Sequence, residues 1–114
     1  MSGAEFARFA NDLLRATTGI DRMADLAVER VGRGARESAI AYSPDDTGDL
    51  DKSITFRRKG SVGIVEASIF YAAFQEFGTS QMAPNPFIGP AADDWAPRLL
   101  AEVEEICDEV VKKL

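Results

Sequence analysis

The sequence predicts an α+β fold with N-terminal helices, a small antiparallel sheet built on a hairpin, a short aromatic helix and a long C-terminal helix packed on the sheet. Two observations carry this prediction. Apolar residues recur at three- and four-residue steps near both ends of the 114-residue chain, which is typical of amphipathic helices. Between them, two short stretches rich in β-forming residues flank a Gly-Ser turn, which is typical of a hairpin. We expect a single domain, 1–114, made of a helical N-terminal arm (1–42) and an α+β core (43–114).

The first helix is expected over residues 4–17. Its apolar residues at helical spacing are Phe6, Phe9 or Ala10, Leu13 and Leu14. Gly19 can end this helix and Asp21 can cap the next one. Arg8, Arg15 and Arg22 recur every seven residues and would lie on one side of a continuous helix, either as a solvated face or as a docking stripe.

Residues 22–42 continue the helical pattern, as a second helix or as a continuation after a kink. Gly32 and Gly34 lie inside this pattern, where each costs about 1 kcal/mol relative to alanine. They either mark a bend or let another backbone approach closely. The sequence leaves both explanations open.

The stretch SPDDTGDL, residues 43–50, ends the helix and reverses the chain, because Pro44 disfavours helix at the preceding residue. It contains Asp46, Thr47 and Gly48, the active-site tripeptide of aspartic proteases, and a short chain with one copy could form a homodimeric protease. Such a site must be shielded so that two carboxylates share one proton. The neighbouring acidic residues, Asp45, Asp49 and Asp51, favour a solvated structural turn instead.

The composition gives little support for another kind of catalytic site or for a metal site. The chain has no histidine, which removes the commonest general base and transition-metal ligand. The acidic run at 45–51 does not fit the EF-hand calcium-binding pattern, whether the pattern begins at Asp45 or at Asp46. We therefore expect no catalytic residues, no cofactor and no metal. Cys107, the single cysteine, is expected to be a buried small hydrophobic residue of the last helix.

The middle of the chain predicts a hairpin and a short helix. Strands are expected at 53–59 and 62–69, with Gly60 and Ser61 in the turn. Tyr71, Phe74 and Phe77 indicate an aromatic helix that ends at Gly78.

Residues 87–88 are expected to form a short strand, followed by a last helix from Pro90 to Leu114. Pro97 either kinks this helix or marks its true start. We expect the helix to pack across the sheet through Trp95, Leu99 and Val103.

The charge and hydropathy limit the partners. A net charge of −6 and a pI near 4.6 argue against binding driven by phosphate neutralisation. The apolar runs are far shorter than the roughly 20 residues that span a bilayer. We expect neither direct sequence-specific nucleic-acid binding nor a membrane.

Three blocks of residues follow one another in a recognisable order. The first is a Pro-x-x-Thr-Gly-x-Leu turn with a Ser-Ile strand, the second is Tyr-Ala-x-x-x-Glu-Phe-Gly-Thr, and the third is Pro-Phe-x-x-Pro-Ala. Their residues here are Pro44, Thr47, Gly48, Leu50, Ser53 and Ile54, then Tyr71, Ala72, Glu76, Phe77, Gly78 and Thr79, then Pro86, Phe87, Pro90 and Ala91. From about residue 36 to the C-terminus, this order resembles the small tail-component family of long-tailed bacteriophages. The chain departs from the pattern at Asp49 and Gly89, where the family often carries a basic residue.

The resemblance implies a structural virion protein of the head-to-tail junction, a neck or tail-completion component without catalytic residues. It would assemble in the bacterial cytoplasm as a ring of copies, with six as one candidate number. The ring would join the head-tail connector to the tail-tube protein. The alternatives are a tail terminator of the same junction, the protease above, or a small regulatory binding protein.

We hypothesise that the hairpin and the region from Glu76 to Phe87 form the contact between subunits. The candidate interface residues are Tyr71, Phe74, Glu76, Phe77, Gly78, Thr79, Pro86 and Phe87. Phe77 and Phe87 would be the apolar anchors, and Gly78 would fix the turn of the loop. Glu76 would hydrogen-bond or form a salt bridge at the interface, with a general acid as the alternative.

Overall fold

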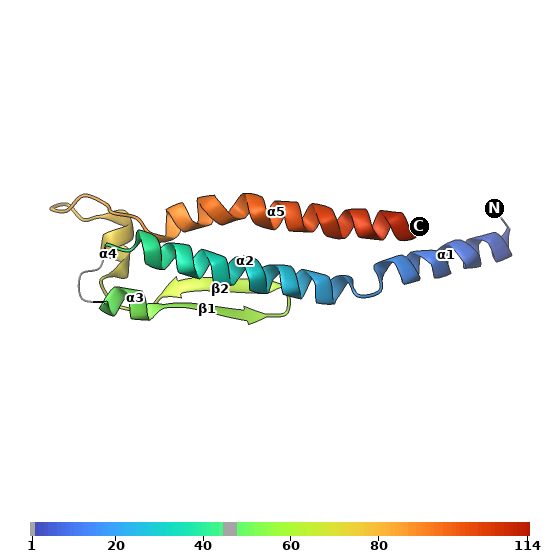
Figure 1. Ribbon diagram of the computed structural model, residues 1–114, viewed down its shortest axis with the longest axis horizontal. Helices are drawn as coiled ribbons and strands as arrows, with labels where there is room; N and C mark the ends of the chain where they lie inside the picture. The colour runs from blue at the N-terminus through green and yellow to red at the C-terminus, as the bar shows by residue number, and fades with distance from the viewer. Residues whose placement is uncertain (1, 45–47) are drawn as a thin grey trace.

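The computed structural model describes residues 2–44 and 48–114 (Figure 1). Its elements in chain order are α1 (Gly3–Thr17), α2 (Ile20–Tyr42), α3 (Asp49–Ser53), β1 (Ile54–Lys59), β2 (Val62–Ala67), α4 (Ala72–Phe77) and α5 (Ile88–Lys113). The molecule measures 70 × 20 × 19 Å, with a radius of gyration of 20.2 Å. A compact chain of this length has a radius of gyration of about 13 Å. The protein is therefore strongly elongated.

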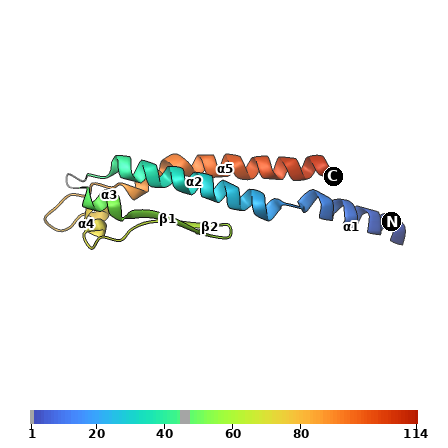
Figure 2. The same cartoon turned by 60° about the horizontal axis from the view of Figure 1, so that its bottom comes forward.

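The α+β fold class is confirmed, but the long helix α5 packs on a different element than expected. It lies along α2, and α2 in turn lies against both strands (Figures 1 and 2). The strands pair antiparallel from Ile54 opposite Ala67 to Lys59 opposite Val62. A lone two-stranded hairpin is marginally stable in water, and α2 supplies the apolar surface that covers it. The central layer is thus α2, a helix with two packed faces.

Gly32 and Gly34 make this two-sided packing possible. A β-carbon on Gly32 would overlap the ring of Phe56 in β1, and one on Gly34 would overlap the ring of Trp95 in α5. The Trp95 Nε1–H donates a hydrogen bond of 2.7 Å to Ser38 Oγ, which fixes the indole over α2. Helix α2 continues through both positions. The glycines therefore admit aromatic rings from neighbouring elements.

Replacing Gly34 with alanine is expected to destabilise the protein, although alanine favours helix by about 1 kcal/mol. The added methyl group must displace the Trp95 ring, and overpacking of this kind costs about 1–3 kcal/mol. Chemical unfolding should show a net loss near 1 kcal/mol. In a Trp95→Leu background the same change should be neutral or stabilising, because the ring is gone. An equal loss in both backgrounds would contradict this explanation.

Arg30 and Tyr42 of α2 also make polar contacts that fix α5 along this helix. Arg30 binds the Glu102 carboxylate through two hydrogen bonds, of 2.8 and 2.7 Å. Near the other end of α2, the Tyr42 hydroxyl donates to Asp94 Oδ2 at 2.6 Å. This hydrogen bond and the aspartate charge raise the pKa of Tyr42.

The main core lies at the end of the molecule that carries α3 and α4. Its buried residues are Ala39, Leu50, Ile54, Ala72, Phe87 and Ala91. Leu50 belongs to α3, a five-residue helix in a segment that the sequence predicted to be a turn and the start of the hairpin. The short helix directs Leu50 inward, where it is 1 % exposed.

Several predicted element boundaries are corrected. Gly19, with φ of 85°, is the N-cap of α2, and Asp21 lies in the first turn of that helix rather than at the cap. Residues 87–88 form no strand, because Phe87 is the N-cap of α5 and Ile88 is its first residue. Pro97 lies inside α5 and does not mark its start.

Helix α1 extends away from the rest of the chain. Its start is fixed by a capping box, in which Ser2 Oγ accepts from Glu5 N–H and the Glu5 carboxylate accepts from Ser2 N–H. Only Ala16, near its end, is buried. Both views show α1 continuing beyond the C-terminus of α5 (Figures 1 and 2). Of the expected N-terminal arm, α1 is the part that projects, whereas α2 is central.

Candidate assembly surface

Exposed aromatic side chains gather on and beside α4. Phe77 is 78 % exposed and Phe74 is 50 % exposed. Phe70, just before the helix, is 84 % exposed and meets the half-buried Tyr71 ring edge-on, with the ring centroids 5.3 Å apart. Sequence reasoning missed Phe70, although its spacing to Phe74 and Phe77 follows the helical period. The four rings form an apolar surface at one end of the long molecule.

An open groove of about 310 Å³ lies beside Phe77. Apolar side chains from three elements line much of it: Val65, Ala67, Ala72, Ala73, Phe87 and Ile88. Phe77 stands at this groove while most of its own surface faces solvent. The aromatic end therefore presents both a projecting ring and an apolar recess.

Glu76 is engaged within its own chain. Its Oε2 accepts hydrogen bonds from Phe87 N–H at 2.8 Å and Ile88 N–H at 3.1 Å, and its Oε1 accepts from Gly89 N–H at 2.7 Å. These are orphan donors at the start of α5, and the positive end of the helix dipole favours a carboxylate there. A β-carbon on Gly89 would lie 3.3 Å from Glu76 Oε1, so glycine leaves room for the carboxylate. Glu76 thus ties α4 to the start of α5.

Phe87 requires a correction, because it is fully buried in its own subunit. Its exposed fraction is 0 %, and it packs in the core cluster with Leu50 and Ile54. It lines the floor of the groove rather than projecting from the surface as an interface anchor.

The loop after α4 is held by backbone hydrogen bonds. Gly78 ends the helix with φ of 75° and ψ of 179°, an extended glycine conformation rather than the expected left-handed helix stop, and its N–H donates to Phe74 O at 2.8 Å. Thr79 N–H donates to Met82 O at 2.8 Å, and Asn85 N–H donates to Gln75 O at 2.8 Å. Thr79 and Pro86 are exposed in this loop. The loop is therefore a defined projection of the aromatic end.

The predicted turn is only partly described. Pro44 follows Ser43, the C-cap of α2, and Gly48, with φ of 85°, is the N-cap of α3. Asp46 and Thr47 lie outside the described residues. The described elements on either side are helices, whereas the protease hypothesis requires apolar strands there.

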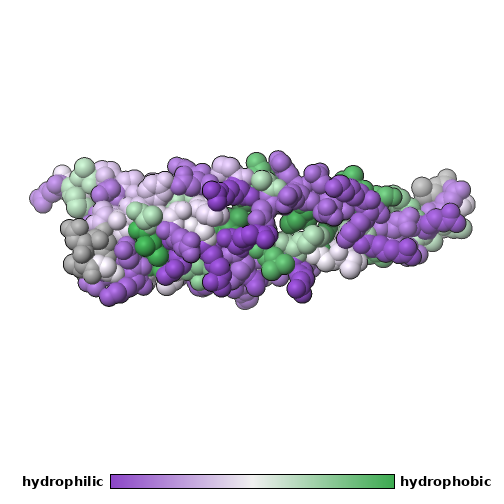
Figure 3. All heavy atoms as spheres, in the orientation of Figure 1, coloured by the Kyte–Doolittle hydropathy of each residue, from purple (hydrophilic) through white to green (hydrophobic). Residues whose placement is uncertain are grey.

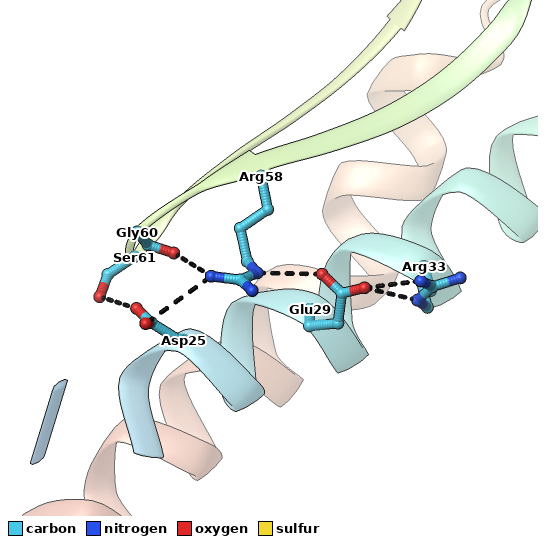
Figure 4. Close-up of polar contacts among 6 residues, drawn as sticks. All are labelled: Asp25, Glu29, Arg33, Arg58, Gly60 and Ser61. Carbon is cyan, nitrogen blue, oxygen red and sulfur yellow. Dashed lines mark hydrogen bonds and ion pairs between the residues drawn. The ribbon is translucent and has the colours of Figure 1, made fainter. Parts of the chain in front are cut away.

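A polar cluster attaches the tip of the hairpin to α2 (Figure 4). Arg58 of β1 points between Glu29, at 3.0 Å, and Asp25, at 3.7 Å, and also donates to Gly60 O at 2.8 Å. Arg33 binds the other oxygen of Glu29 at 2.7 Å. Hydrogen bonds from Arg33 and Arg58 hold the pKa of Glu29 below its ordinary value. Arg33 and Arg58 are thus both engaged with partners in the chain.

Cys107 differs from the expectation, because its side chain is exposed on α5 rather than buried. Among residues 2–44 and 48–114, no group of three or more potential metal ligands comes together. In the same part of the chain, no helix has the length and apolar character needed to cross a membrane.

These features define an elongated α+β protein that exposes apolar side chains at its ends. The chain matches the family described as bacteriophage HK97-gp10, putative tail-component, over residues 4–78. It belongs to this family and is a phage tail component, which places it in the virion. No curated protein and no solved structure matches it. The match includes α1 and the part of α2 before residue 36, which the resemblance stated from the sequence did not cover, and it ends before the Pro86–Phe87 block.

Proposed function

We propose that this tail component is a structural subunit of the head-to-tail junction, a neck or tail-completion protein that assembles as a ring between the head-tail connector and the tail tube. The observation that carries the proposal is the exposed Phe77 beside an apolar groove. Rings require heterologous contacts, in which one patch meets a different patch on the next copy. Phe77 of one subunit would enter the groove of its neighbour.

The rigidity of the aromatic end supports this role. Glu76 and the loop hydrogen bonds fix α4 relative to α5 before any partner binds. A preorganised surface loses less conformational entropy on association. The subunit would join its neighbours in the host cytoplasm and bind connector and tube proteins through the faces of the completed ring.

Replacing Phe77 with aspartate is expected to prevent ring association while leaving the fold intact, because the ring of Phe77 is largely exposed. A buried, unpaired carboxylate in an apolar groove is strongly unfavourable. Light scattering after size-exclusion chromatography should show monomers at concentrations where the native chain forms rings. Leu26→Asp, at an exposed apolar position in α2, outside the hairpin and the aromatic end, is the matched control and should still assemble.

The same two variants test the function in a phage that lacks its own copy of the gene. With Phe77→Asp supplied in trans, electron microscopy should show filled heads and finished tails that have not joined. Tails of irregular length would instead support a tail terminator. Normal infectious particles that lack the protein would contradict a junction role and favour the regulatory alternative.

A further inference from the structure

The layers of the molecule differ in charge. Helix α2 lies between the hairpin and α5, so the hairpin and α5 form the two outer layers (Figures 1 and 2). The hairpin, residues 54–67, contains three basic side chains and one acidic side chain. Helix α5 contains seven acidic and three basic side chains. The two outer layers therefore carry net charges of opposite sign.

The outer face of the hairpin combines basic and apolar side chains. Phe56 packs against α2, and successive side chains of a strand point to opposite faces, so Arg57 and Lys59 point away from α2. Their partners across the hairpin, Ile64 and Val62, lie on the same outer face. These four side chains are exposed and help to line an open hollow of about 310 Å³.

The outer side of α5 combines acidic and apolar side chains. Trp95 marks the side that faces α2. Glu104 follows nine residues later, which at about 100° per residue places it on the opposite side of the helix. Leu100, Asp108 and Val111 lie within about 40° of Glu104 around the helix, and all four are exposed. In the space-filling view, hydrophobic side chains reach the upper edge of the molecule over α5, among hydrophilic ones (Figure 3).

The two outer surfaces lie at the same level along the molecule. Ser61 in the hairpin turn donates to Asp25 Oδ1 at 2.8 Å, so the turn lies beside the first half of α2. On the other side of α2, Arg30 holds Glu102. Since α5 runs antiparallel to α2 (Figure 1), the two turns of α5 after Glu102 lie at the level of the hairpin turn. These two turns carry the acidic residues of the outer side.

Charge decides which of these surfaces can meet. Within the described part of the chain, Lys59, Glu104 and Asp108 form no ion pair and no side-chain hydrogen bond. Arg57 holds Glu66 of its own hairpin at 3.1 Å. Two hairpins face to face would bring basic side chains of both copies together, and two α5 helices would bring acidic ones together. Such like-charge contacts are unfavourable, whereas a hairpin and an α5 helix are complementary.

We propose that the outer face of the hairpin in one copy packs on the outer side of α5 in the next copy. The basic side chains of the hairpin face Glu104 and Asp108, and the apolar side chains of the two surfaces pack beside them. The inference rests on the proposed ring and names a contact between its subunits. The two surfaces lie on opposite sides of α2 and at the same level. Repeated contacts are therefore heterologous, and neighbouring copies stand side by side with parallel long axes.

Charge reversal tests this contact in the purified chain. The first variant carries Arg57→Glu and Lys59→Glu, and the second carries Glu104→Arg and Asp108→Arg. Each variant alone brings like charges together, so sedimentation equilibrium should show self-association weakened by about tenfold. In an equimolar mixture, each altered surface meets its complement on the other variant, so native association should return.

Variants at Val62 test the apolar part of the contact. Val62→Asp should weaken association by about tenfold or more, since it places a carboxylate against the acidic side of α5. Val62→Lys removes the same apolar group but adds the favoured charge, so it should weaken association less. Leu26→Asp, at a residue 50 % exposed in α2, is the matched control and should behave as the native chain. Circular dichroism should show that all variants stay folded, because the altered residues are exposed.

Three results would overturn the proposal. The native chain could stay monomeric at every concentration, which would contradict the ring as well. The charge-reversal variants could associate normally, or their equimolar mixture could stay as weak as each variant alone. Either result would show that these charges do not face each other across two copies. If Phe77→Asp prevents assembly while the charge reversals do not weaken it, the junction role stands and the hairpin contact falls.

Discussion

Replacing Phe87 with alanine is expected to lower the free energy of unfolding by about 3–5 kcal/mol, the usual cost of emptying a core phenylalanine site. Phe87 is fully buried among Leu50, Ile54 and Ala72. It also precedes the first residue of α5, so the core and the start of this helix should loosen together. Urea unfolding followed by circular dichroism measures the change.

Phe77→Ala is the matched control, because Phe77 has the same side chain at a nearby position in the sequence but is largely exposed. Its free energy of unfolding should stay within about 0.5 kcal/mol of the native value. Phe87→Leu keeps most of the side-chain volume and should lower the free energy of unfolding by less than about 1.5 kcal/mol. This variant therefore reports on packing at position 87 even if the alanine variant unfolds. Similar losses for Phe77→Ala and Phe87→Ala would contradict the division into a surface ring and a core ring.

Local patterns predicted the elements whose residues repeat with a clear period. The hairpin with its turn at Gly60 and Ser61, and the two N-terminal helices, appear where expected. Helix α3 was missed because five residues are too few for a helical period to appear, and its acidic residues are also typical of turns. Residues 87–88 were misread because two apolar residues fit a strand as well as a helix start.

Contacts between distant elements could not be read from local spacing. The apolar stripe of α5 was visible in the sequence, but the stripe alone does not show which element it packs against. In the structure this element is α2. The sequence raised close approach at Gly34 as one of two explanations, and only the fold shows that the approaching group is the Trp95 ring. The aromatic character of α4 was predicted from the sequence. The burial of Phe87 was not predicted, because it depends on the path by which the loop from Gly78 returns to the core.

Glu76 shows most clearly how one side chain links this loop to the assembly surface. It lies eleven to thirteen residues before the three amides that it caps, a separation that no helical or strand period relates. Glu76→Ala should therefore lower the free energy of unfolding by about 2–3 kcal/mol, since hydrogen bonds to charged groups contribute about 1.5–3 kcal/mol each and water can replace part of them. Glu76→Gln keeps one acceptor oxygen and should cost about half as much.

The control is Glu104→Ala, which removes a carboxylate without an ion pair or side-chain hydrogen bond in the described part of the chain and should change the free energy of unfolding by less than about 0.5 kcal/mol. Hydrogen exchange should show lost protection first at the amides of Ile88 and Gly89, because these lose their acceptor. Unchanged protection there would mean that Glu76 does not cap α5 in solution. Since Glu76 also holds α4, its loss should weaken subunit association through the orientation of Phe77, even without touching the neighbouring copy itself.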